Sequence, residues 1–172
     1  MPTFDATVGS ATATSLATRA FAADYFAVSP AGSWWASKTQ PEQESLLMQG
    51  TMRLEAESWR GTKAVAATQA LSWPRAGCTD RDGAAIATTV IPKEVGYALC
   101  EVIAQYKRLE DAGTDPRAPN DLSQFASVTA GDISITMADA DVAPVTDGIP
   151  TAAKRWVAHL LKTGSMFGKV VR

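Results

Sequence analysis

The strongest constraint on the fold is an amphipathic repeat between residues 92 and 112. Apolar side chains recur there every three or four residues: Val95, Leu99, Val102, Tyr106 and Leu109. This spacing places them on one face of a helix, which must be buried against other elements. Pro92 suits the first turn, and Gly113 suits the position after the last. The pattern predicts a long helix that needs partners.

Residues 41–59 predict a second helix with a clear start. Thr39 and Glu42 have the spacing of a capping box, in which each satisfies a backbone N–H of the other. The predicted core face carries Met48, Met52 and Trp59, with Leu47 and Leu54 beside it. Gly50 either weakens this helix by about 1 kcal/mol or marks a close helix–helix approach.

Three other helical segments are predicted. One begins at Thr14 or Ser15 and ends at Ala27, and a short turn after Pro30 carries Trp34 and Trp35. The last begins after Gly148, has Pro150 in its first turn, and ends at Gly164.

The remaining segments are rich in turn signals. Residues 60–90 lack a helical period, although Ala84–Val90 is compatible with a short strand. Between Val128 and Met137 the period changes to two, and Gly131 suggests a hairpin. The predicted fold is therefore mainly α: a small bundle of about four helices, a short β-hairpin or strand pair, and extended N- and C-terminal arms.

The predicted organisation is an N-terminal arm (1–13), a helical domain (14–164) and a C-terminal tail (165–172). The domain contains a loop and strand insertion at about 113–147. Residues 109–153 hold eight acidic side chains and one Arg, whereas 154–172 hold five basic side chains and no acid. This dipolar arrangement suits subunit contacts, or equally a solvated loop beside an ordinary helix.

Charge, hydropathy and cysteine content exclude several classes of protein. The net charge of −2 gives no global attraction to nucleic acid or to an anionic membrane. No apolar run reaches the length of a membrane span, and no secretory leader is recognisable. Cys78 and Cys100 lie in unrelated contexts, which suits free thiols in a reducing cytoplasm.

Catalytic and cofactor motifs are missing from the sequence. His159 has no Cys or carboxylate at helical spacing, so a zinc site or a catalytic triad has no partner. Asp80-Arg81-Asp82-Gly83 resembles the start of a calcium loop but lacks its later ligands, and a turn is the better interpretation. We expect no enzyme activity, metal or cofactor.

Nucleic-acid binding has some support. Trp59 and Trp73 are bracketed by the cations Arg53, Arg60, Lys63, Arg75 and Arg81, and cations beside aromatic rings are what a single-strand stacking platform needs. Arg60, Lys63 and Arg75 are the candidate DNA contacts. The alternative is structural, because Trp59 continues a helix stripe and Trp73 precedes a proline.

Several motifs carry a resemblance to a known family. They are Trp59-Arg60-Gly61, Gln69–Arg75, Asp80–Gly83 and Ile91–Val95, preceded by Ala22–Ala27 and Pro41–Arg53. With these the chain resembles the phage DnaT-like single-stranded-DNA-binding proteins. That family in turn resembles the head-completion or head–tail adaptor (connector) proteins of tailed phages.

The resemblance to adaptors implies a virion structural protein, assembled in the host cytoplasm and located at the head–tail interface. Its expected partners are the portal protein, tail or nozzle proteins and further copies of itself, in a ring of twelve around a channel for packaged DNA. The candidate portal-docking tail comprises Met166, Phe167, Lys169, Val170, Val171 and Arg172. The alternative is a DnaT-like single-stranded-DNA-binding protein acting in replication.

Overall fold

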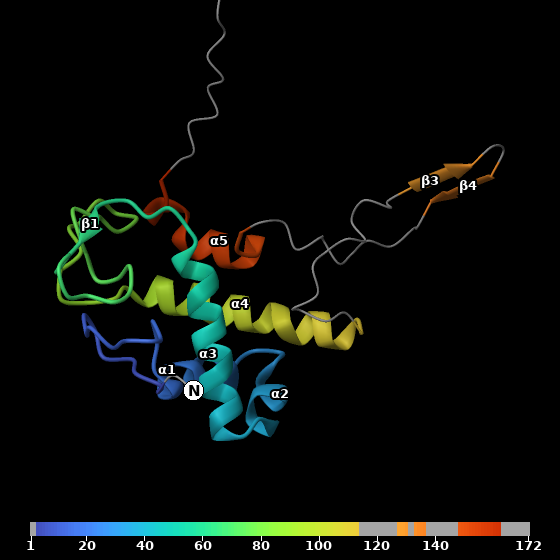
Figure 1. The fold of residues 1–172 in the computed structure, drawn as a ribbon, viewed down its shortest axis with the longest axis horizontal. Coiled ribbons are helices and arrows are strands. Elements are labelled where there is room, and N and C mark those ends of the chain that lie inside the picture. Colours follow the sequence, from blue (N-terminus) through green and yellow to red (C-terminus); the bar gives the residue numbers. More distant parts are fainter. Residues whose placement is uncertain (1–2, 114–126, 131–132, 137–147, 163–172) are drawn as a thin grey trace, which may run out of the picture.

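The computed structural model describes residues 3–113, 127–130, 133–136 and 148–162. Within these residues the chain forms five α-helices, one 3₁₀ turn and two short antiparallel strand pairs (Figure 1). The elements are α1 (Arg19–Ala27), α2 (Gly32–Ser37), α3 (Gln40–Glu55), β1 (Thr62–Lys63), β2 (Arg75–Ala76), α4 (Lys93–Asp111), β3 (Ser127–Ala130), β4 (Ile133–Thr136), α5 (Thr151–Val157) and η2 (Ala158–Leu160). The mainly α fold class is confirmed.

Helix α4 is the centre of the bundle. All five residues of its predicted stripe are buried. Pro92 precedes its first residue, and Gly113 follows its end with a φ of 67°, a conformation that glycine adopts without a steric penalty. Helices α1, α3 and α5 all pack against it (Figure 1).

Helix α3 begins where its capping box predicted. The Glu42 carboxylate accepts hydrogen bonds of 2.7 Å from both the backbone N–H and the hydroxyl of Thr39. These bonds satisfy a donor that the first helical turn leaves without an internal partner.

The predicted core face of α3 is wrong for its two methionines, whereas Trp59, Leu47 and Leu54 are buried. Met52 is 72% exposed and Met48 is only partly buried. The buried residues of the helix are Leu47, Gly50, Thr51 and Leu54. A Cβ at Gly50 would lie 2.6 Å from Leu99 Cδ1 of α4, so the close-approach interpretation of this glycine is confirmed. Small residues at the crossing let the two backbones approach, and this rotates the methionines outward.

Helix α1 starts at Arg19, four or five residues later than predicted. The Thr18 hydroxyl accepts a hydrogen bond of 3.1 Å from the backbone N–H of Phe21, which makes Thr18 the N-cap. The short helix predicted to carry Trp34 and Trp35 is confirmed as α2. There Trp35 stacks on Phe26 of α1 with ring centroids 4.8 Å apart.

The segment between α3 and α4 is irregular. Strands β1 and β2 pair antiparallel, with Thr62 opposite Ala76 and Lys63 opposite Arg75. The strand predicted at Ala84–Val90 is wrong, since this stretch contributes only an isolated bridge between Thr79 and Ala85. The Asp80 carboxylate accepts hydrogen bonds from the N–H groups of residues 82 and 84. These bonds form the tight turn between the two bridged residues.

The predicted hairpin near residue 131 is confirmed. Strands β3 and β4 pair antiparallel, with Ser127 opposite Thr136 and Ala130 opposite Ile133. Gly131 lies outside the described residues. The C-terminal tail 165–172 also lies outside them, and with it Met166, Phe167, Lys169, Val170, Val171 and Arg172. The three domain boundaries stay predictions.

Helix α5 is shorter than predicted and continues as the 3₁₀ turn η2. It is fixed to the body at its start, where Arg53 Nη2 of α3 donates to the carbonyl of Gly148 at 3.1 Å. Ile149 N donates to the Glu57 carboxylate at 3.0 Å. No helix in the described part of the chain is long and apolar enough to cross a membrane.

Candidate nucleic-acid interface

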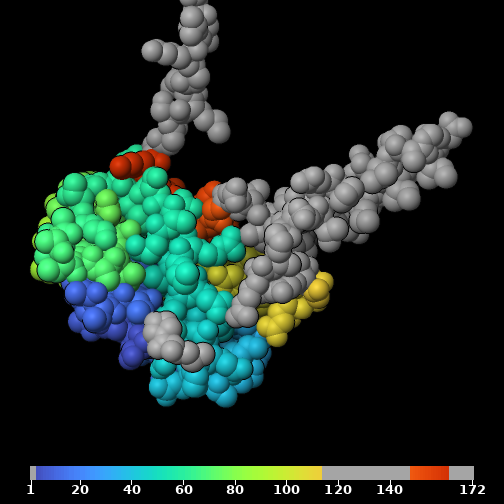
Figure 2. Space-filling model, viewed as in Figure 1, coloured from blue at the N-terminus to red at the C-terminus, as the bar shows by residue number. Residues whose placement is uncertain are grey.

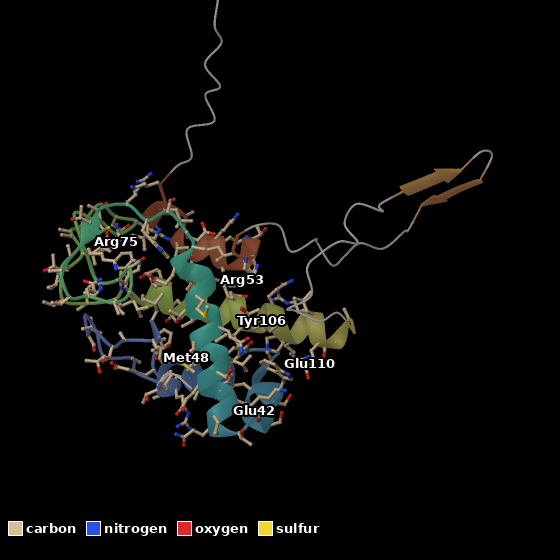
Figure 3. All side chains as sticks on the ribbon, in the orientation of Figure 1. Glu42, Met48, Arg53, Arg75, Tyr106 and Glu110 are labelled. Atoms are coloured by element: carbon tan, nitrogen blue, oxygen red, sulfur yellow. The ribbon has the colours of Figure 1, made fainter. Side chains whose placement is uncertain are left out.

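Arg75 is a buried residue that stabilises the loop following α3 (Figure 3). Only 9% of the residue is exposed. Its guanidinium donates to the carbonyl oxygens of Ser72 at 3.0 Å and Gly61 at 2.7 Å, and also to those of Trp59 and Arg60. Since these bonds use the guanidinium inside the protein, we leave Arg75 out of the candidate interface.

Lys63 has a similar internal role. Its side chain is partly buried, and its Nζ donates to the carbonyl oxygens of Gln69 at 3.2 Å and Ala70 at 3.1 Å. This cation ties β1 to the loop before β2, so we also leave it out.

The two tryptophans between α3 and α4 are part of the core. Trp59 is 3% exposed and Trp73 is 1% exposed, and their rings meet edge to face at 5.6 Å. Trp59 Nε1 donates to the carbonyl of Leu54 at 3.1 Å, closing the end of α3. Their structural interpretation is confirmed, and neither ring can stack on a nucleotide base.

Arg60 is the one predicted DNA contact that lies on the surface. Its backbone N–H donates to Leu160 O at 2.8 Å, and its Nε donates to Leu161 O at 2.9 Å. Arg60 thus lies over the C-terminal end of η2, although 101 residues separate it from Leu161 in the sequence.

A second arginine reaches the same helix from another turn. Arg81, in the turn that begins at Asp80, donates from Nη2 to Arg155 O at 2.6 Å and to Trp156 O at 3.2 Å. Carbonyl groups at a helix C-terminus lack internal partners, and a cation there is electrostatically favourable. Sequence patterns gave no sign of this contact, because the two partners are 74 residues apart.

The segments that meet here carry five basic residues, and we call them the α5 basic cluster: Arg60, Arg81, Arg155, His159 and Lys162. Figure 2 shows the loop after α3 lying beside the end of α5. All but His159 are exposed. The backbone of Lys162 is held next to the loop after α3, because its N–H donates to Ser58 O at 2.7 Å.

His159 lies close enough to charges of both signs for them to affect its pKa. Partial burial lowers the pKa of His159, and the charges of Arg81 and Arg60 lower it further. Glu94 and Asp80 oppose this shift, but the net direction is downward. His159 is therefore mostly neutral at pH 7, while the other four side chains are cationic.

Three of the cluster cations differ from Lys38, Lys107 and Arg108, which lie in salt bridges. Among the described residues, no carboxylate forms a salt bridge with Arg81, Arg155 or Lys162. In contrast, Lys38 lies 3.5 Å from Glu110, Arg108 lies 3.6 Å from Glu101, and Lys107 pairs with Asp111. Arg81, Arg155 and Lys162 therefore present exposed cationic groups to solvent.

Other chemistry has little basis in the described residues. They contain no group of three or more side chains arranged to hold a metal ion. Cys78 and Cys100 are both buried free thiols, and burial raises the pKa of Cys100 to about 12, which makes it a poor nucleophile.

Together the fold and the cluster define a small helical domain whose exposed basic residues lie on segments that meet beside α5. The chain belongs to the family described as "Putative DnaT-like ssDNA binding protein", whose model matches residues 4–172. No curated protein matches the chain, and no solved structure does.

This family assignment corrects the expected function. The main expectation, a head-to-tail adaptor in the virion, is wrong, and so is its description as a connector or head-completion protein. The sequence motifs that suggested the adaptor function instead stabilise the loop after α3, as Arg75, Trp59 and Trp73 illustrate. Such residues identify a fold and its family but specify no partner. The predicted portal, tail and ring partners and the virion location stay untested.

Proposed function

We propose that this protein binds single-stranded DNA through the α5 basic cluster and performs no catalysis. The observation that carries the proposal is the convergence of Arg60, Arg81, Arg155 and Lys162 from three separate segments. The family description supports the same ligand.

The chemistry of the cluster suits a phosphate backbone. Arginine presents several N–H donors in a planar fork that matches phosphate oxygens. Arg60 and Arg81 are each held by helix carbonyl groups, so less side-chain entropy remains to be lost on binding. Because the whole chain carries a net charge of −2, attraction to DNA must come from this local arrangement.

Fluorescence anisotropy of a labelled oligothymidylate, measured over a range of salt concentrations, tests the proposal. The variant Arg81→Ala/Arg155→Ala/Lys162→Ala should bind more weakly at low salt. Each phosphate contact to a single strand contributes about 0.7 to the slope of log affinity against log salt. Removal of three contacts should therefore reduce that slope by about 2.

The matched control is Lys38→Ala/Lys107→Ala/Arg108→Ala, which removes the same charge from cations engaged in salt bridges. It should change the affinity much less. Since Arg81→Ala also removes hydrogen bonds to α5, the pair Arg155→Ala/Lys162→Ala serves as a milder test. The proposal fails if the wild-type protein does not bind at low salt, or if both triple variants bind equally well.

A further inference from the structure

We propose that Phe21, Tyr97 and Trp156 form a platform on which unpaired bases stack beside the α5 basic cluster. This inference rests on the proposed function, and it names the part of the surface that distinguishes single strands from duplex. We call these three residues the stacking row.

The three rings come from different helices and touch in sequence. The centroid of Phe21 of α1 lies 5.5 Å from that of Tyr97 of α4, which lies 4.8 Å from that of Trp156 of α5. All three residues are partly exposed. A Cβ at Gly96 would lie 2.5 Å from Phe21 Cε1, so this glycine allows the Phe21 ring to lie against α4.

The other tryptophans of the described chain are covered. Trp35, Trp59 and Trp73 are at most 3% exposed. Trp34 is partly exposed, but its Nε1 donates to Glu110 at 2.9 Å, and Lys38 Nζ lies 4.9 Å from the centroid of its ring. Trp156 is also partly exposed, and the ring that lies against it is that of Tyr97 in the same row.

The stacking row and the basic cluster meet at Trp156. Its carbonyl oxygen accepts the bond from Arg81, and Arg155 precedes it in the helix. At the other end, Lys93 stands one helical turn before Tyr97 in α4, so the two share a face. A nucleotide could thus place its base on a ring and its phosphate near a cation, the combination found in single-strand binding sites.

This arrangement has a consequence for the choice of ligand. Bases in a duplex already stack on one another, whereas unpaired bases are free to stack on aromatic rings. Stacking on rings tolerates any base, because every base has a π-face. We therefore expect a preference for single strands over duplex with little dependence on sequence.

The first experiment changes only the ligand. Oligothymidylate should bind at least about fivefold more tightly than an abasic sugar-phosphate strand of the same length. If both strands bind equally, the stacking row is refuted while the proposed function survives. If neither strand binds at low salt, the proposed function itself fails.

The second experiment changes the protein. Trp156→Ala and Tyr97→Ala should each abolish most of the preference for oligothymidylate over the abasic strand, and Trp156→Phe should retain it. Trp34→Ala, the matched control, should leave it unchanged. Equal behaviour of Trp156→Ala and Trp34→Ala would refute the inference.

Binding should also quench tryptophan fluorescence. Trp156→Phe should remove most of this quench, whereas Trp34→Phe should keep it. This readout needs only the conservative variants, so it decides the question even if Trp156→Ala fails to fold. An unchanged quench in Trp156→Phe would contradict the assignment.

Discussion

Replacement of Arg75 by Ala should destabilise the protein without removing a DNA contact. The side chain makes three well-formed bonds, to the carbonyl oxygens of Arg60, Gly61 and Ser72, and a longer one of 3.5 Å to that of Trp59. Hydrogen bonds to a charged group contribute about 1.5 kcal/mol or more each. Water can reach the exposed residues 60 and 61 in the variant and recover part of the loss.

We therefore expect Arg75→Ala to lower the free energy of unfolding by about 3 kcal/mol. In a chain of this size, that corresponds to a fall in Tm of roughly 6–12 °C. Urea unfolding followed by circular dichroism measures the change directly. Arg75→Lys should recover little, because an ammonium group cannot reproduce the planar fork that spans several carbonyls.

The control is Arg155→Ala, which removes an exposed cation and should change the free energy of unfolding by less than about 0.5 kcal/mol. The two variants should show opposite patterns: Arg75→Ala loses stability, and Arg155→Ala loses DNA affinity. If Arg75→Ala unfolds like the wild type and binds DNA more weakly, Arg75 contacts DNA after all, and the assigned structural role is wrong.

Two further predictions concern the packing of α3 and the titration of the cluster. Gly50→Ala should destabilise the protein by about 1 kcal/mol. Overpacking costs about 1–3 kcal/mol, and the higher helix propensity of Ala offsets about 1 kcal/mol of that cost. If urea unfolding shows a stabilised variant, α3 and α4 do not approach as closely as this argument requires. His159 has a folded pKa below its unfolded value of about 6.5, so its proton binds preferentially to the unfolded chain and stability falls as the pH drops through this range. His159→Gln should flatten that fall between about pH 7.5 and 5.5, and an unchanged pH profile of the urea midpoint would contradict it.

Much of the candidate interface was beyond sequence reasoning. Arg60 was predicted as a DNA contact and lies on the surface, but Lys63 and Arg75 point into the loop. The sequence shows that they are cations near tryptophans and does not show which carbonyls they meet. Arg81 also counts among the cations near tryptophans, but its contact with α5 could not be predicted, and Trp156 was not a candidate for the same reason. One stands in a turn and the other in a helical pattern, and only folding brings them together.

The sequence by itself determined the local elements. Alternation and capping signals specify α4, the start of α3 and the β3–β4 hairpin, because propensity, caps and periodicity act over a few neighbouring residues. Only the tertiary structure decided which face of α3 is buried. At the crossing with α4, the absence of a Cβ at Gly50 leaves room for Leu99 while Met52 is exposed, and no local pattern contains that contact. The basic cluster likewise depends on contacts between distant segments, since Arg81 bonds to α5 and Arg60 bonds to Leu161 just after η2.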